Sequence, residues 1–140
     1  MSPIKKEEFP ILISRKVDYG LQCLIYLAKK KEGEWISVQD LSRKLKIPYV
    51  FLAKIVQTLV SNNILESRRG KEGGVRLKRK EVKLSQVIAI LNPKFSLSRC
   101  LKEEFFCFLK NRCPLYQWLS KMEKNLQLEL EKVSLLELVK

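Results

Sequence analysis

The fold is decided by residues 37–79, which read SVQDLSRKLKIPYVFLAKIVQTLVSNNILESRRGKEGGVRLKR. Apolar residues recur at helical spacing over 37–45 and again over 49–61, and Pro48 between them fits the first turn of a new helix. Two short helices joined by a tight turn are typical of a helix-turn-helix, whose second helix enters the major groove of DNA. The stretch therefore predicts a DNA-binding unit.

A β-hairpin is predicted directly after this unit. Residues 64–69 and 75–79 have the pattern of two strands around the glycine-rich turn 70–74. Such a hairpin is a wing, because its turn brings the backbone close to phosphates and its basic side chains neutralise them. The second helix adds an amide and an ammonium group that can read base edges. The candidate DNA-binding residues are Tyr49, Lys54, Gln57, Arg68, Arg69, Lys71, Arg76 and Lys78.

The charge balance favours a polyanionic partner. The 140 residues include 28 Lys and Arg against 15 Asp and Glu, which gives a net charge of +13. RNA and membrane surfaces would attract this charge equally, so the choice of DNA depends on the helix-turn-helix and the wing. No apolar run is long enough to span a bilayer, and the polar start does not resemble a secretory signal. We therefore expect a cytoplasmic protein that has no membrane partner.

The pattern predicts a mainly α-helical chain with a small β-hairpin wing. We expect a flexible leader over 1–10, a winged helix-turn-helix domain over 11–92, a cysteine-bearing sensor loop over 93–114, and a dimerisation helix with a terminal turn over 115–140. The long helix, about 115–133, keeps an apolar stripe although the winged core is already complete. An exposed stripe of this size is costly in a monomer, so we expect a homodimer.

Three cysteines lie close together beyond the wing, at Cys100, Cys107 and Cys113. Thiolates are the preferred ligands of iron–sulfur clusters and of zinc, and they are also reactive toward oxidants. Cytosolic cysteines are mostly reduced, so a structural disulfide is not the first expectation. A cluster, a metal-free thiol switch and a zinc site all remain open. Cys23 lies among the apolar positions of a first helix, about 14–30, and we expect it in the core.

Two segments resemble one known family. Residues 14–21, SRKVDYGL, and residues 68–77, RRGKEGGVRL, together with the helix-turn-helix and the spaced cysteines, are similar to the winged-helix regulators that include the iron–sulfur cluster regulator IscR and the nitric-oxide-sensitive repressor NsrR. The resemblance implies a dimer whose long C-terminal helices cross. It also implies a [2Fe–2S] or [4Fe–4S] cluster bound by cysteines that match Cys100, Cys107 and Cys113.

The fourth ligand and the DNA readout differ between members of this family. In one branch an aspartate from the other subunit completes the cluster site, and Asp18 falls at that position. In another branch a histidine after the third cysteine does so, and this chain contains no histidine. The cluster regulator also carries a glutamate that helps to select its DNA sites, where this chain has Ala53. We therefore expect weak base reading by the second helix.

These observations predict a DNA-binding transcriptional regulator, with repression as the expected mode. It would sense redox state, nitric oxide or iron–sulfur supply through a cysteine-ligated cluster. A dimer would place two recognition helices about 34 Å apart on a near-palindromic operator. The alternatives are a metal-free thiol/disulfide regulator, a zinc-containing regulator and a protein-binding adaptor. An enzyme is not expected, because the chain lacks histidine, a nucleotide-binding loop and the residues of a catalytic triad.

Overall fold

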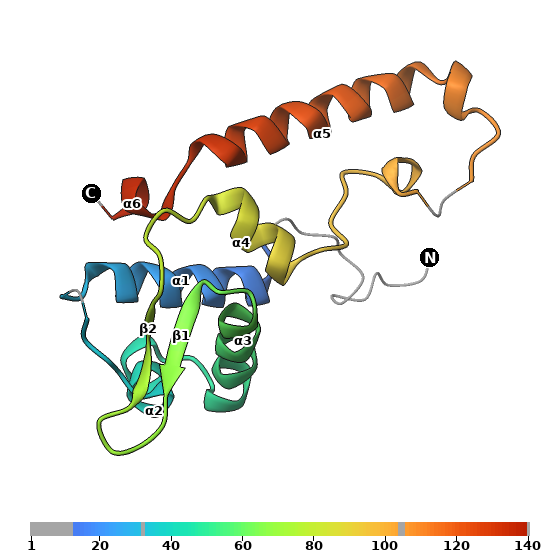
Figure 1. Cartoon of the computed structure of the whole chain (residues 1–140). Helices are drawn as coiled ribbons and strands as arrows, with labels where there is room; N and C mark the ends of the chain where they lie inside the picture. Colours follow the sequence, from blue (N-terminus) through green and yellow to red (C-terminus); the bar gives the residue numbers. More distant parts are fainter. Residues whose placement is uncertain (1–12, 32, 104–105, 140) are drawn as a thin grey trace.

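A computed structural model of the chain describes residues 13–31, 33–103 and 106–139, so the predicted leader lies outside the described residues. The elements follow one another along the chain in Figure 1 and confirm a mainly helical fold with one hairpin. Their order is α1 (Arg15–Lys29), α2 (Val38–Leu45), α3 (Tyr49–Ser61), β1 (Leu65–Arg68), β2 (Gly74–Leu77), α4 (Leu84–Leu91), η2 (Arg99–Leu101), η3 (Lys110–Arg112), α5 (Pro114–Lys132) and α6 (Leu135–Leu138).

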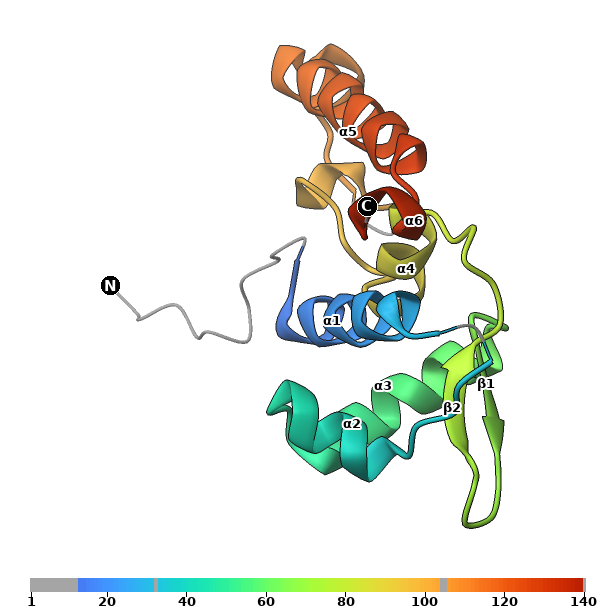
Figure 2. The same cartoon turned by 90° about the vertical axis from the view of Figure 1, so that its left-hand side faces the viewer.

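Helix α1 is the central element of the fold. Its N-cap is Ser14, whose hydroxyl accepts a hydrogen bond from the Val17 backbone N–H at 3.4 Å. Leu24 on its inner face is fully buried. Figure 2 shows α2, α3 and the hairpin on one side of α1, and α4, α5 and α6 on the other. The elements that are predicted to bind DNA therefore share one core, built around α1, with α4 and α6.

The helix-turn-helix forms where the sequence predicts it. The hydroxyl of Ser37 accepts from the Asp40 backbone N–H at 3.1 Å and caps α2. The turn is held by the Ser42 hydroxyl, which donates to the Ile47 carbonyl at 2.5 Å. Helix α3 then begins directly after Pro48. Its inner residues, Leu52, Ile55, Val56 and Leu59, are buried against the core.

The hairpin is tied to the loop that follows α1. Strands β1 and β2 pair antiparallel, with Leu65 opposite Leu77 and Arg68 opposite Gly74. Ile36 adds an isolated bridge to Val75, with N···O distances of 3.1 and 2.8 Å. A two-stranded hairpin alone is marginally stable, so this extra pairing helps to fix the wing against the helix-turn-helix.

The C-terminal helices return to the winged core. The backbone N–H of Leu135 donates to the Val82 carbonyl, and that of Leu84 donates to the Val133 carbonyl, both at 2.8 Å. Leu135 is only 2% exposed and joins the core cluster, and α6 packs against α1. Helix α5 packs along α4 and has no buried residue of its own. Among the described helices none is both long and apolar enough to cross a membrane.

Candidate nucleic-acid interface and cysteine segment

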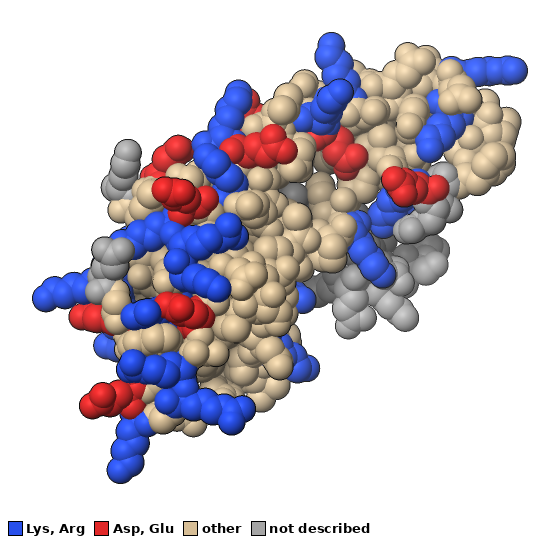
Figure 3. All heavy atoms as spheres, in the orientation of Figure 1, with Lys and Arg blue, Asp and Glu red and all other residues tan. Residues whose placement is uncertain are grey.

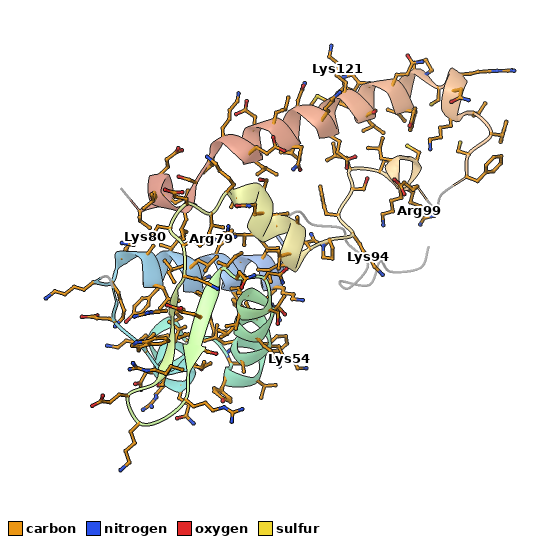
Figure 4. The ribbon with its side chains drawn as sticks, viewed as in Figure 1. Lys54, Arg79, Lys80, Lys94, Arg99 and Lys121 are labelled. Atoms are coloured by element: carbon orange, nitrogen blue, oxygen red, sulfur yellow. The ribbon has the colours of Figure 1, made fainter. Side chains whose placement is uncertain are left out.

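Helix α3 turns an exposed face away from the core. All three of its candidate residues, Tyr49, Lys54 and Gln57, lie on that face. Val50 and Phe51 lie there as well, at 65% and 54% exposed. Lys54 extends from α3 into solvent in Figure 4. The helix can therefore offer one ammonium group and one amide to a duplex, beside an unusually apolar start.

The wing carries several exposed cations. Figure 3 shows Lys and Arg side chains crowded over the lower part that the hairpin forms. Arg69 and Lys71 are exposed at its turn, and neither makes a hydrogen bond or ion pair with the described part of the chain. Arg79 and Lys80 continue the basic surface just beyond β2 (Figure 4). The tip thus presents free cations at the place where phosphates would approach.

The structure brings candidate residues of the helix and the wing to one groove. A groove of about 360 Å³ runs between α3 and the hairpin, and both Gln57 and Arg68 line it. The guanidinium of Arg68 also donates to the Glu72 carbonyl in the turn, at 2.6 Å. A duplex against this surface would meet the recognition helix and the wing together.

Two further candidate wing residues, besides Arg68, have protein partners. Arg76 is half-buried and forms an ion pair with Glu66 on the neighbouring strand. The ammonium of Lys78 donates to the Asn63 side-chain oxygen at 3.2 Å, although Lys78 remains exposed. Trp35 lies against both Arg68 and Arg76 and gives no signal in the sequence, because a lone tryptophan in a connecting loop has no spacing pattern.

The cysteine segment joins α4 to α5. Cys100 lies in η2, Cys107 lies before η3, and Cys113 is the N-cap of α5. All three are free and half-buried. The Ser98 hydroxyl lies 3.2 Å from the Cys100 sulfur, within hydrogen-bonding distance. The segment also contains exposed cations, of which Lys94 and Arg99 appear in Figure 4.

The three thiols do not meet at one point. Within the described ranges no three Cys, Asp or Glu side chains are grouped so that they could hold a metal ion. Asp18 is exposed on α1, where its carboxylate accepts a hydrogen bond from the Gln22 side-chain amide at 3.1 Å. The ligands suit an iron–sulfur cluster or zinc in their chemistry, but their arrangement in this chain does not fit either group.

Both ends of the cysteine segment are anchored on α5. At its start, the Leu97 backbone N–H donates to the Glu123 carboxylate at 2.9 Å. At its end, Cys113 is the N-cap residue from which α5 continues directly, and η2 packs against α5 in between. A change in the shape of this segment would therefore act on α5 directly.

The fourth cysteine is a core residue, as its position in the sequence predicts. Cys23 is fully buried in α1, and burial raises the pKa of its thiol from the ordinary 9.0 to about 12. The thiol is therefore uncharged at neutral pH and sheltered from reagents, whereas the other three cysteines are only half-buried.

This pKa predicts a loss of stability in alkali. Between pH 9 and 12 the unfolded chain releases the Cys23 proton and the folded chain keeps it, so the free energy of unfolding should fall by roughly 1 kcal/mol per pH unit. Urea unfolding at pH 8, 9 and 10 measures the slope. Other groups also titrate there, so the control is Cys23→Ala, whose slope should be shallower. Parallel profiles for the two proteins would contradict the assignment.

Comparison with protein families gives one match over nearly the whole chain. The family model, Rrf2, is described as an iron-dependent transcriptional regulator, and it matches residues 13–140.

Solved structures share the same fold. The oxidized form of Staphylococcus aureus CymR is 24% identical, with a TM-score of 0.71 over 91% of this chain and 95% of that one. CymR, the global cysteine regulator of B. subtilis, is 23% identical, with a TM-score of 0.71 over 99% and 97%. IscR of T. potens is 20% identical, with a TM-score of 0.67 over 96% and 89%. At these identities the likeness concerns the fold alone.

Proposed function

Since the chain belongs to the Rrf2 family of transcription regulators, we propose that it binds double-stranded DNA as a homodimer and that Cys100, Cys107 and Cys113 adjust this binding. Rrf2 regulators bind DNA, are typically dimers and are not enzymes. One observation carries the proposal: a basic wing and an exposed recognition helix share a core with α4, the helix from which a segment of free cysteines runs to α5. Repression is the mode that we propose.

The proposed dimer is supported by the outer face of α5. Leu115, Trp118 and Met122 follow one another at helical spacing and are 61%, 57% and 42% exposed. A second copy of the same helix would cover this stripe, which is costly to leave in water. The two recognition helices would then lie about 34 Å apart, so the proposed operator is near-palindromic.

In its first form the proposal assigns the three thiolates to an iron–sulfur cluster, [2Fe–2S] or [4Fe–4S], with Asp18 of the partner subunit as the fourth ligand. The iron-dependent description of the family and the fold shared with IscR support this form. The separation of the sulfur atoms counts against it, because the segment would have to close around the group. Redox state, nitric oxide and cluster supply are the signals that such a group would report.

A second form needs no metal. Two of the three cysteines join in a disulfide, two thiol protons leave, and two electrons pass to an oxidant such as a hydroperoxide. Free, half-buried thiols and the shared fold with a regulator solved in an oxidized form support it. Zinc held by the same thiolates is a third form, which the separated sulfur atoms disfavour equally.

The first experiment is anaerobic purification followed by iron, sulfide and zinc analysis. The same protein is then used to select duplexes of roughly 30 base pairs from a random pool, and DNA retardation measures its affinity for the selected duplexes. Stoichiometric iron and sulfide support the cluster form, whereas a metal-free protein whose DNA affinity changes with oxidation supports the thiol form. A protein-binding adaptor would select no duplex sequence, so a failure to enrich any sequence would reject the proposed function.

Arg69 offers a direct test of the wing. Replacing Arg69 by alanine should weaken binding to the selected duplex by about 1–3 kcal/mol, because its exposed guanidinium is free to enter the minor groove. Fluorescence anisotropy at fixed salt measures the loss. Lys121→Ala removes the same charge from α5, far from the wing in Figure 4, and should have little effect. Equal losses in both variants would mean that the wing has no special role.

A further inference from the structure

An aromatic ring from the loop between α1 and α2 lies against the wing. The centroid of the Trp35 indole is 4.5 Å from the guanidinium carbon of Arg68 and 4.2 Å from that of Arg76. Both distances are well inside the range of an attractive cation–π contact. The next residue, Ile36, is the one that pairs with Val75 of β2. The Trp35 ring and the Ile36 bridge therefore both connect the loop between α1 and α2 to the hairpin.

The strand register explains why both arginines reach one ring. Arg76 lies opposite Glu66, and Arg68 lies two residues beyond Glu66 on the same strand. Because side chains two residues apart share a face, all three project from one face of the hairpin. Trp35 is half-buried against that face. A single indole thus contacts both strands of the wing.

The two arginines differ in how firmly they are held. Arg76 is paired with Glu66, and its guanidinium also donates to the Gly33 carbonyl at 3.3 Å. Arg68 is exposed and makes one hydrogen bond, to the Glu72 carbonyl in the turn. Since a guanidinium has five N–H donors, Arg68 keeps most of its capacity for another partner, whereas Arg76 is fixed by groups of the protein.

We propose that Trp35 is the positioning residue of the wing: its ring fixes the hairpin against the loop that leads from α1 into α2 and holds Arg68 ready for a DNA phosphate, while Arg76 serves as a structural support. This inference rests on the proposed DNA binding. A wing that is already fixed loses less conformational freedom when it binds, so its affinity is higher at an unchanged number of phosphate contacts. The effect is therefore one of pre-organisation and not of charge.

The test separates these roles by affinity and by salt dependence. Trp35→Ala should weaken binding to the selected duplex roughly three- to tenfold, with an unchanged slope of log affinity against log salt, and Trp35→Phe should restore most of the affinity because it keeps a ring. Arg68→Ala should reduce the salt slope by about 0.9, the value for one phosphate contact, and Arg76→Ala should leave the slope unchanged. Anisotropy titrations at several salt concentrations measure all four variants.

A second measurement does not depend on DNA. Trp35→Ala should speed hydrogen exchange of the Val75 amide, which donates to Ile36 beside the ring, and Trp35→Phe should leave it slow. Circular dichroism checks that the helices remain. An alanine variant with wild-type affinity and wild-type exchange would overturn the inference, as would an Arg68→Ala variant with an unchanged slope. If the unmodified protein selects no duplex, the proposed function fails, and amide exchange alone decides whether Trp35 fixes the wing.

Discussion

Replacing Gly74 by alanine is expected to lower the free energy of unfolding by about 3 kcal/mol and to weaken binding to the selected duplex by about tenfold or more. Gly74 has φ +136°, a conformation that residues with a Cβ rarely adopt. An added Cβ would also overlap the Ile36 carbonyl and lie 2.7 Å from the Ser37 nitrogen. Because the Ile36 carbonyl accepts the Val75 hydrogen bond, the strand must move away and the bridge that ties down the wing must break.

Gly70 provides a matched control within the same turn. It has φ +109°, but no atom lies within 4 Å of the place that its Cβ would occupy. Gly70→Ala should therefore cost only the backbone strain, about 1 kcal/mol, and should leave the bridge intact. Urea unfolding and anisotropy measure both variants. Equal losses would mean that backbone conformation governs the wing and that the close approach of Ile36 does not matter.

Most helices of this chain could be predicted because a local signal marks at least one of their ends. Ser14 and Ser37 cap α1 and α2, and Ser134 caps the last turn by accepting from the Glu137 N–H. Pro48 marks the start of α3. A glycine-rich turn between two short strands identifies the wing in the same way. Each of these signals depends on residues within a few positions of one another, which is the range over which sequence patterns are informative.

The candidate site could be predicted only in part, because the contacts of its side chains are made with residues that are distant in the sequence. Basic composition places Arg68, Arg69 and Arg76 together on the wing, but it does not show that Arg76 is paired with Glu66 and stacked on Trp35. Likewise, the spacing of the cysteines along the chain does not show whether their sulfur atoms lie close together in space. The return of Leu135 to the core is also invisible locally, since its contacts lie on α1 and at Val82.

Replacing Cys100, Cys107 and Cys113 together by serine is expected to abolish the response of DNA binding to oxidation and to iron. In the unmodified protein we expect the affinities of the two states to differ by about 1–3 kcal/mol, the usual size of coupling between two sites. The physical reason is the anchoring of the segment on α5 at Leu97 and Cys113: a bond between cysteines changes the path between these two points. The changed path would shift α5, which is the helix proposed to hold the dimer together.

The measurement compares DNA affinity in reduced, peroxide-treated and iron-and-sulfide-reconstituted samples of each protein. Cys23→Ala is the control, because its thiol is buried and lies outside the segment, so it should keep the full response. The triple variant should give one affinity in all three samples. Asp18→Ala then separates the chemistries: it should shorten the lifetime of a reconstituted cluster if the carboxylate is a ligand, and it should leave a peroxide response untouched. A triple variant that still responds would show that regulation does not pass through these thiols, and the proposed sensor would have to be abandoned even if the wing binds DNA as expected.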